Sequence, residues 1–125
     1  MKTINTKNAP KAIGPYSQAK VVNNFIFTSG QIALKIDGSM VSNNFELECI
    51  QVLDNLKEIL KSSGSDMSNI IKLTVYLTDL SKFDILNNVF KRYFSETLPA
   101  RSTIEVSKLP KDARVEIEAI GTIND

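Results

Sequence analysis

The stretch NIIKLTVYLTD, residues 69–79, decides the fold class because its apolar residues alternate with polar ones. In an extended chain this alternation places the two kinds of side chain on opposite faces. The apolar set is Ile71, Leu73, Val75 and Leu77. The polar set is Lys72, Thr74, Tyr76 and Thr78. The pattern predicts a strand with one face in a core and the other open to solvent or to a partner.

A segment with helical periodicity precedes this strand. From Phe45 onward apolar residues recur every three or four positions, and the sequence KSSGS predicts the end of the helix, with Gly64 as its C-terminal cap. Cys49 falls on the apolar stripe. A reactive thiolate needs exposure and nearby positive charge, so this position favours a buried, inert thiol over a catalytic one.

A second helix is predicted after the strand, with Asp79 or Ser81 as its N-terminal cap. Its apolar stripe comprises Phe83, Leu86, Val89, Phe90, Tyr93 and Phe94. At about 100° per residue, Asn87 falls at the edge of that stripe whereas Asn88 points to the back of the helix. Of the two asparagines, only Asn87 is expected to reach a partly buried site.

Three further stretches predict strands. NNFIFTSGQI, residues 23–32, is apolar on both faces and is followed by an Asp-Gly turn in IDGS. RSTIEV (101–106) and RVEIEAIG (114–121) alternate like the first strand. We expect the helices to cover the face that carries Ile104, Val106, Val115, Ile117 and Ala119. The other face is then expected to carry Arg101, Thr103, Glu105, Arg114, Glu116, Glu118 and Ile120.

This arrangement is an α+β fold in which two helices cover one face of a mixed sheet. The uncovered face carries Tyr76, Thr78, Thr103 and Ile120 among its charges, a mixture suited to a packed, partly polar interface. We therefore expect a homo-oligomer in which these faces meet and sites lie near the seams.

Composition excludes several classes of chemistry. The 125 residues suit one domain, 1–125, and a formal charge of +1 gives no general attraction to nucleic acids or membranes. The chain has no histidine, which removes Ser-His-Asp and Cys-His nucleophiles and histidine-based metal sites. With one cysteine and no signal-peptide pattern, a cytoplasmic protein is expected.

Four positions are candidates for binding or catalysis, each with a structural alternative. Arg101 could hold a ligand carboxylate, or pair with a glutamate on its sheet face. Glu116 could direct a water molecule, or form a cross-strand salt bridge. Tyr16, presented by a Gly-Pro turn, could bind a ligand or pack its loop. The Ser29-Gly30 pair could let the backbone approach a ligand, or simply make a turn.

Several stretches together resemble one known family, the RidA proteins (reactive intermediate deaminases, also called the YjgF family). They are AIGPYSQA (12–19), FIFTSGQI (25–32), VYLTDLSKFDILN (75–87) and PARSTIEVSKLPKDARVEIEAIG (99–121). The resemblance implies a chorismate-mutase-like fold, a sheet of about six strands backed by two helices, in a homotrimer with clefts between subunits. It implies hydrolysis of 2-imino acids, such as 2-iminopropanoate and 2-iminobutanoate, to 2-oxo acids and ammonia. It implies no cofactor and no metal.

The resemblance also implies roles for individual residues. Arg101 matches the arginine that binds the substrate carboxylate, and Glu116 matches the glutamate that positions the attacking water. The residues matching the lining of the cleft are Tyr16, Ser29, Gly30 and Asn87, and Phe83 matches an apolar position near it. Many relatives have a cysteine at the position of Thr103. Because this chain has a threonine there, a mechanism that needs a thiol at this position is excluded. Thr103 could still hold a water or the imine nitrogen.

The resemblance leaves a second class of function open. The same fold could serve as a binding or regulatory trimer that holds a small carboxylate without converting it. RNA cleavage, translation inhibition and chaperone-like behaviour are also roles of the family. The presence of both Arg101 and Glu116 favours catalysis, and near-neutral charge without histidine disfavours RNA cleavage.

Overall fold

The computed structural model describes residues 1–123, and within them six strands form one sheet in the order β1-β2-β3-β6-β4-β5. The strands are β1 (Lys2–Ile4), β2 (Ala19–Val22), β3 (Phe25–Thr28), β4 (Ile70–Leu77), β5 (Ala100–Glu105) and β6 (Val115–Thr122). The β4–β5 pair is parallel and the other neighbouring pairs are antiparallel. The sheet is therefore mixed, as predicted, although sequence periodicity had not indicated β1 or β2.

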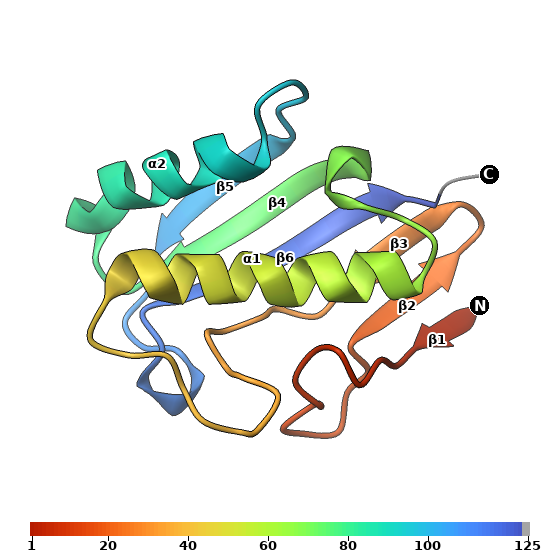
Figure 1. Ribbon diagram of the computed structural model, residues 1–125, viewed down its shortest axis with the longest axis horizontal. Helices are drawn as coiled ribbons and strands as arrows, with labels where there is room; N and C mark the ends of the chain where they lie inside the picture. The colour runs from red at the N-terminus through yellow and green to blue at the C-terminus, as the bar shows by residue number, and fades with distance from the viewer. Residues whose placement is uncertain (124–125) are drawn as a thin grey trace.

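Two helices, α1 (Phe45–Ser62) and α2 (Phe83–Tyr93), lie on the same face of this sheet (Figure 1). The predicted end of α1 is confirmed, since Gly64 has a φ of 87°, a conformation that favours glycine. Asp79 is confirmed as a cap, although it caps the 3₁₀ turn Leu80–Lys82 that leads into α2. Two further 3₁₀ turns, Met67–Asn69 and Pro110–Asp112, precede β4 and β6.

The core lies between the helices and the central strands. Leu73, Val75 and Leu77 of β4 face it with no exposed surface, as do Val115 and Ile117 of β6. The prediction that Ile71 belongs to this set was wrong. A register irregularity between Ile70 and Lys72 puts Ile70 in the core and leaves Ile71 44% exposed.

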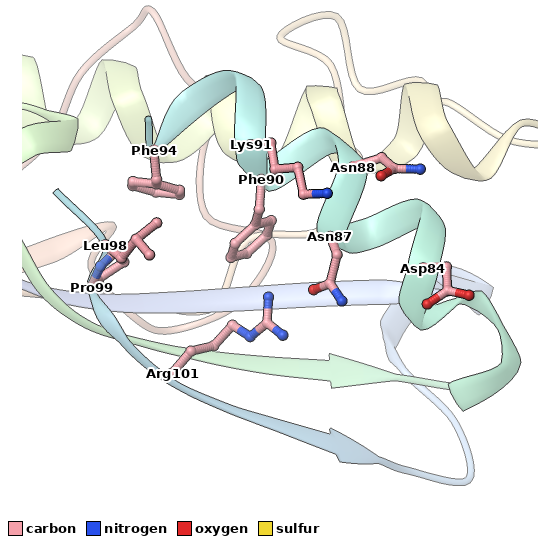
Figure 2. Close-up of a pocket in the computed structure, with 9 residues that line it drawn as sticks. All are labelled: Asp84, Asn87, Asn88, Phe90, Lys91, Phe94, Leu98, Pro99 and Arg101. Atoms are coloured by element: carbon pink, nitrogen blue, oxygen red, sulfur yellow. The ribbon is translucent and has the colours of Figure 1, made fainter. Parts of the chain in front are cut away.

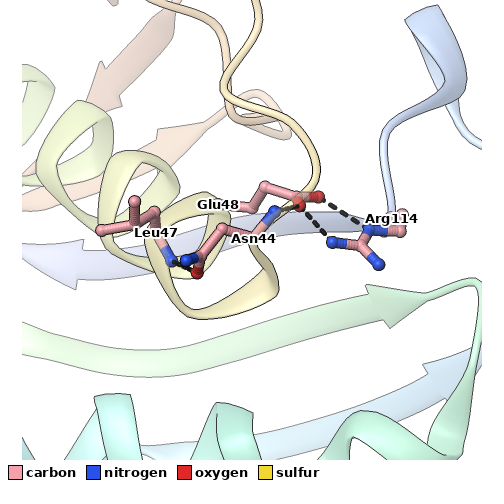
Figure 3. A network of polar contacts seen from close by, with 4 residues as sticks. All are labelled: Asn44, Leu47, Glu48 and Arg114. Carbon is pink, nitrogen blue, oxygen red and sulfur yellow. Dashed lines mark hydrogen bonds and ion pairs between the residues drawn. The ribbon is translucent and has the colours of Figure 1, made fainter.

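An ion pair joins the start of α1 to the segment that enters β6 (Figure 3). Glu48 is buried and accepts hydrogen bonds from the Arg114 guanidinium, one of them from Nε at 3.0 Å. Glu48 also accepts the Asn44 backbone N–H at 3.2 Å, while the Asn44 side chain caps the helix by accepting from the Leu47 N–H. Burial of a charge is tolerated here because its hydrogen-bonding capacity is filled.

The predicted orientation of β5 was wrong. In the parallel pairing, Arg101 lies opposite Leu73 and Thr103 opposite Val75, so both face the helices. Ile104 lies opposite Tyr76 on the uncovered face and is 45% exposed. The alternation was recognised but assigned to the wrong side, because apolar Ile104 was expected to seek the core.

The predicted orientation of Glu105, on the uncovered face, was wrong for the same reason. Glu105 lies opposite Leu77, on the helix side, and its Oε1 accepts the backbone N–H of Leu80 at 3.0 Å. Because β5 is an edge strand, its helix-facing side chains meet only the rim of the helical layer. Polar groups can therefore occupy positions that would be core positions in a central strand.

The uncovered face carries exposed apolar side chains that a solvated sheet would not need. Val22, Phe25, Phe27 and Ile104 are each between 40% and 45% exposed. Tyr76, Glu116, Glu118 and Ile120 lie between them on β4 and β6. Exposed apolar side chains interspersed with polar groups on one face are consistent with an interaction surface.

Candidate active site

Arg101 is the charged group around which the candidate site is built. Its guanidinium carbon lies 5.2 Å from the ring centre of Phe83 and 5.0 Å from that of Phe90, both on α2. Within residues 1–123 Arg101 makes no ion pair or hydrogen bond, so the predicted alternative of a pair with Glu105, Glu116 or Glu118 is not observed. Burial lowers the pKa of Arg101, with no carboxylate to oppose the effect. A cation held by aromatic rings without a counter-ion is suited to an anionic ligand.

Beside Arg101 lies a cavity of about 670 Å³ between α2 and β5 (Figure 2). Figure 2 shows the Arg101 guanidinium pointing from β5 toward α2, with Asn87 and Phe90 next to it. The lining consists of Asp84, Asn87, Asn88, Phe90, Lys91, Phe94, Leu98, Pro99 and Arg101. The lining mixes four apolar residues with five polar or charged ones, so the cavity offers both an apolar wall and hydrogen-bonding groups to a small polar ligand.

The structure brings Asn87 to this cavity, as its helical phase indicated, and places Phe83 against Arg101 rather than in the core. Phe83 is 37% exposed, which excludes a purely structural core position. The lining residues Asp84, Asn88 and Lys91 were missed, although Asn88 is exposed and Figure 2 shows only Asn87 of the two asparagines pointing toward Arg101. The signal was present, because residues 84, 87, 88 and 91 share one helix face by spacing.

Thr103 lies two residues beyond Arg101 on the same face of β5. Its Oγ1 is buried and has no hydrogen-bond partner within residues 1–123. A buried hydroxyl without a partner is unfavourable unless a water or ligand meets it. Thr103 does not line the cavity beside Arg101, so its hydroxyl is next to the candidate site rather than in it.

A second group of predicted residues lies around β6 and the end of β3. Glu116 is half-buried on the uncovered face, and its Oε2 would lie 2.6 Å from a Cβ placed on Gly30. Gly30 and Tyr16 line one small pocket together. Ser29 donates its hydroxyl to the Ser17 carbonyl at 2.6 Å and thereby fixes the loop that carries Tyr16. The absence of a side chain at Gly30 is what gives the Glu116 carboxylate its place.

Burial raises the pKa of Glu116, and the nearby negative charge of Glu118 raises it further. Glu118 is held by Tyr76, whose hydroxyl donates to Glu118 Oε1 at 2.8 Å. The cross-strand salt bridge that was the alternative for Glu116 is not observed within the described residues. A carboxyl group with a raised pKa at a surface recess is suited to accept and return a proton.

The chain does not bring its two groups together. Arg101, Asn87 and Thr103 lie on the helix side of the sheet, whereas Glu116 lies on the uncovered side. Each group therefore contains only some of the residues that the resemblance implied for one cleft.

Within residues 1–123, Cys49 is the one thiol that could act as a nucleophile, and a metal ion would need a group of acidic or cysteine side chains. Cys49 is fully buried, and burial raises the pKa of its thiol to about 12, which confirms the prediction of an inert cysteine. No three acidic or cysteine side chains in residues 1–123 are grouped so as to hold a metal ion.

Fold and geometry define the class as an α+β protein with a partly buried cation, Arg101, beside a small-molecule cavity. A family model described as endoribonuclease L-PSP matches residues 6–123. The chain is 45% identical over 120 residues to the human 2-iminobutanoate/2-iminopropanoate deaminase, covering 95% of this chain and 88% of that protein. It is 46% identical over 121 residues to the chloroplastic Reactive Intermediate Deaminase A of Arabidopsis thaliana, covering 96% and 65%.

Solved structures agree with these sequence comparisons. RidA from the Antarctic bacterium Psychrobacter superposes with a TM-score of 0.95 at 41% identity, covering 98% of this chain and all of that one. TdcF from E. coli, solved with bound serine, gives a TM-score of 0.94 at 40% identity, covering 99% and 100%. The chain belongs to the endoribonuclease L-PSP family, which includes the RidA and YjgF proteins, as its motifs indicated.

Proposed function

We propose that this protein hydrolyses reactive 2-imino acids, such as 2-iminopropanoate and 2-iminobutanoate, to 2-oxo acids and ammonia. The observation that carries the proposal is the environment of Arg101. This partly buried cation has no counter-ion within residues 1–123 and lines a cavity. Curated relatives with 45–48% identity over most of the chain are named for this activity. The E. coli TdcF structure contains bound serine, which carries a carboxylate next to its amino-bearing carbon as a 2-imino acid carries one next to its imine carbon.

In the proposed reaction, Arg101 binds the substrate carboxylate through two charge-assisted hydrogen bonds, which fixes the position of the imine carbon. The amide of Asn87 lies beside it and can orient the substrate. Glu116 takes a proton from a water molecule as its oxygen attacks the imine carbon, and the resulting carbinolamine expels ammonia. Thr103 Oγ1 is buried next to this cavity without a partner within residues 1–123, which supports a role for its hydroxyl in holding a water near the imine nitrogen.

We further propose that the site is completed between subunits of a homotrimer. Two facts support this: Arg101 and Glu116 lie on opposite faces of one sheet, and the uncovered face exposes apolar side chains. A copy that packs its edge strand β5 near the Glu116 face of its neighbour would join the two half-sites. Tyr16, Ser29 and Gly30 would then line the cleft from the Glu116 side.

The experiment that tests the function generates the imino acid in place. An amino acid oxidase produces 2-iminopropanoate or 2-iminobutanoate, and semicarbazide traps what the protein has not hydrolysed. We expect the wild type to reduce trapping and Arg101→Ala not to do so. Arg92→Ala is the matched control, because Arg92 is on α2 but pairs with Glu46 at the surface.

If wild type and Arg101→Ala are both inert while the wild type still binds pyruvate, the protein is a carboxylate-binding module instead.

That residues 1–125 form one domain and that the protein is cytoplasmic both remain predictions. Within residues 1–123 no helix is long and apolar enough to cross a membrane.

A further inference from the structure

The pair formed by Tyr76 and Glu118 has no part in the reaction as described so far. Tyr76 lies opposite Glu116 in the antiparallel register of β4 and β6, and Glu118 lies opposite Thr74. The Tyr76 hydroxyl reaches diagonally to Glu118 Oε1 at 2.8 Å. Diagonal neighbours on one sheet face are within reach of an aromatic side chain.

We propose that Tyr76 is a positioning residue: by holding the Glu118 carboxylate beside Glu116, it keeps Glu116 able to return a proton to the departing nitrogen. This inference rests on the proposed hydrolysis of imino acids. It assigns a role to two residues, Tyr76 and Glu118, that do not touch the substrate.

The surroundings of Glu116 support this assignment. Gly30 confines its carboxylate on one side, since a Cβ there would lie 2.6 Å from Oε2. On its own strand the next outward residue is Glu118, about 7 Å away along an extended chain. Two carboxylates this close disfavour double ionisation, and burial acts in the same direction on Glu116.

The titratable groups on this part of the uncovered face are few. Beyond Glu118, β4 contributes Tyr76, whose own pKa is raised by its hydrogen bond to Glu118 and by both glutamates. Residues 29–31, on the β3 side, contain no titratable group, and β5 contributes apolar Ile104 next to Tyr76. Lys72 lies further along β4, opposite Ile120. Within the described part of one chain, Glu118 is therefore the charge that acts on Glu116.

The proposed hydrolysis needs the Glu116 carboxyl group twice, once to accept a proton and once to return it. When water attacks the protonated imine, its oxygen bonds to the carbon, the C=N π electrons move to nitrogen, and a water proton passes to Glu116. Glu116 then returns that proton to the amino nitrogen, the C–N bond breaks, and ammonia leaves as the remaining hydroxyl proton goes to solvent. A carboxylate with an ordinary pKa is a weaker base, so it would accept the first proton less readily and lose it to solvent before returning it to the nitrogen.

The test compares three single variants with the wild type. Tyr76→Phe removes only the hydroxyl, and Glu118→Gln removes the charge. Tyr93→Phe is the matched control, because Tyr93 also donates to a carboxylate, Asp54, at 2.8 Å, but does so between the helices. The readouts are the pH profile of kcat/KM for imine hydrolysis and the titration of the Glu116 carboxyl carbon by NMR.

Less negative charge beside Glu116 should lower its pKa. We expect Glu118→Gln to move the acidic limb of the profile and the Glu116 titration down by about half a pH unit or more. Tyr76→Phe should act in the same direction by a smaller amount, because Glu118 can then turn away. Both variants should lower kcat several-fold with little change in KM, and Tyr93→Phe should change neither readout.

An active wild type whose acidic limb and Glu116 titration stay in place in both variants would overturn the inference alone. A wild type that does not hydrolyse imino acids would overturn the proposed function, and the proton-transfer role would fall with it. Circular dichroism and native mass of each variant exclude loss of folding as the cause of a change.

Discussion

Arg101 and Glu116 lie on opposite faces of the same sheet, two strands apart in the order β6-β4-β5. Arg101 is fixed under α2 by Phe83 and Phe90, and Glu116 is fixed against Gly30. Neither can reach the other without unfolding its strand. If both act on one substrate, they must come from different copies of the chain.

Subunit complementation follows from this separation. If the protein forms the proposed homotrimer, Arg101→Ala and Glu116→Gln should each be inactive in imine hydrolysis when assembled alone. When the two variants are co-refolded in equal amounts, about a quarter of the clefts combine an intact Arg101 from one copy with an intact Glu116 from its neighbour. We expect roughly that fraction of wild-type activity. A site formed within one chain would give no recovery, and this result would contradict the shared cleft.

The spacing of apolar residues in the sequence predicted which face of β4, β6 and α2 is buried. The faces of β4 beyond its irregularity and of β6 from Val115 onward were predicted correctly, because these central strands must bury one row of side chains under the helices. The prediction that Arg114 faces the uncovered side was wrong, since it lies just before β6 and pairs with Glu48 of α1. The stripe of α2 placed Asn87 at a cavity edge for the same reason. Both short strands β1 and β2 were missed, since three or four residues carry too little alternation to be recognised.

The same rule failed on β5. Ile104 was assigned to the core because it is apolar, but it lies on the uncovered face opposite Tyr76 and is 45% exposed. Arg101 in turn faces the helices because Phe83 and Phe90 offer it aromatic faces. The Tyr76–Glu118 contact also depends on strand register, which a single sequence does not state.

Gly30→Ala should reduce activity without unfolding the protein. The new Cβ would lie 2.6 Å from Glu116 Oε2, so the carboxylate must rotate away from its place. We expect imine hydrolysis to fall about tenfold or more, and the free energy of unfolding to change by less than about 1 kcal/mol. Kinetics and urea denaturation measure the two effects.

Gly38→Ala is the control for that substitution. Gly38 has a φ of 91°, and no atom lies within 4 Å of the position that a Cβ would take, so the variant is strained but contacts no site residue. It should lose about 1 kcal/mol of stability and keep its activity. Full activity in Gly30→Ala would show that the Glu116 carboxylate does not need this recess.

Glu116 should destabilise the folded protein at neutral pH and have no such effect at acidic pH. Its folded-state pKa is raised above the ordinary value of 4.5, so the folded chain holds the proton more tightly than the unfolded chain. The destabilisation is absent below the unfolded pKa and grows as pH rises toward the folded pKa. Glu116→Gln should therefore have a higher Tm than the wild type at pH 7.5, with the difference vanishing below about pH 4.

Calorimetry at the two pH values measures this difference. Glu96→Gln serves as the control, because it removes an exposed carboxylate from the loop before β5. A Glu116→Gln variant that is less stable than the wild type at pH 7.5 would mean that the ionised carboxylate makes favourable contacts, contrary to the raised pKa.

The neighbouring residues Glu46 and Glu48 should differ sharply in their contribution to stability. Both form ion pairs with arginines, but the Glu46–Arg92 pair is about half exposed, whereas the Glu48 side chain is only 4% exposed. Glu48→Ala leaves Arg114 and the Asn44 N–H without their acceptor and should lower the free energy of unfolding by about 3 kcal/mol. Glu46→Ala should lower it by less than about 1 kcal/mol, because water screens an exposed pair. Urea denaturation of the two variants in parallel measures both values, and equal losses would show that burial of Glu48 does not set the strength of its pair.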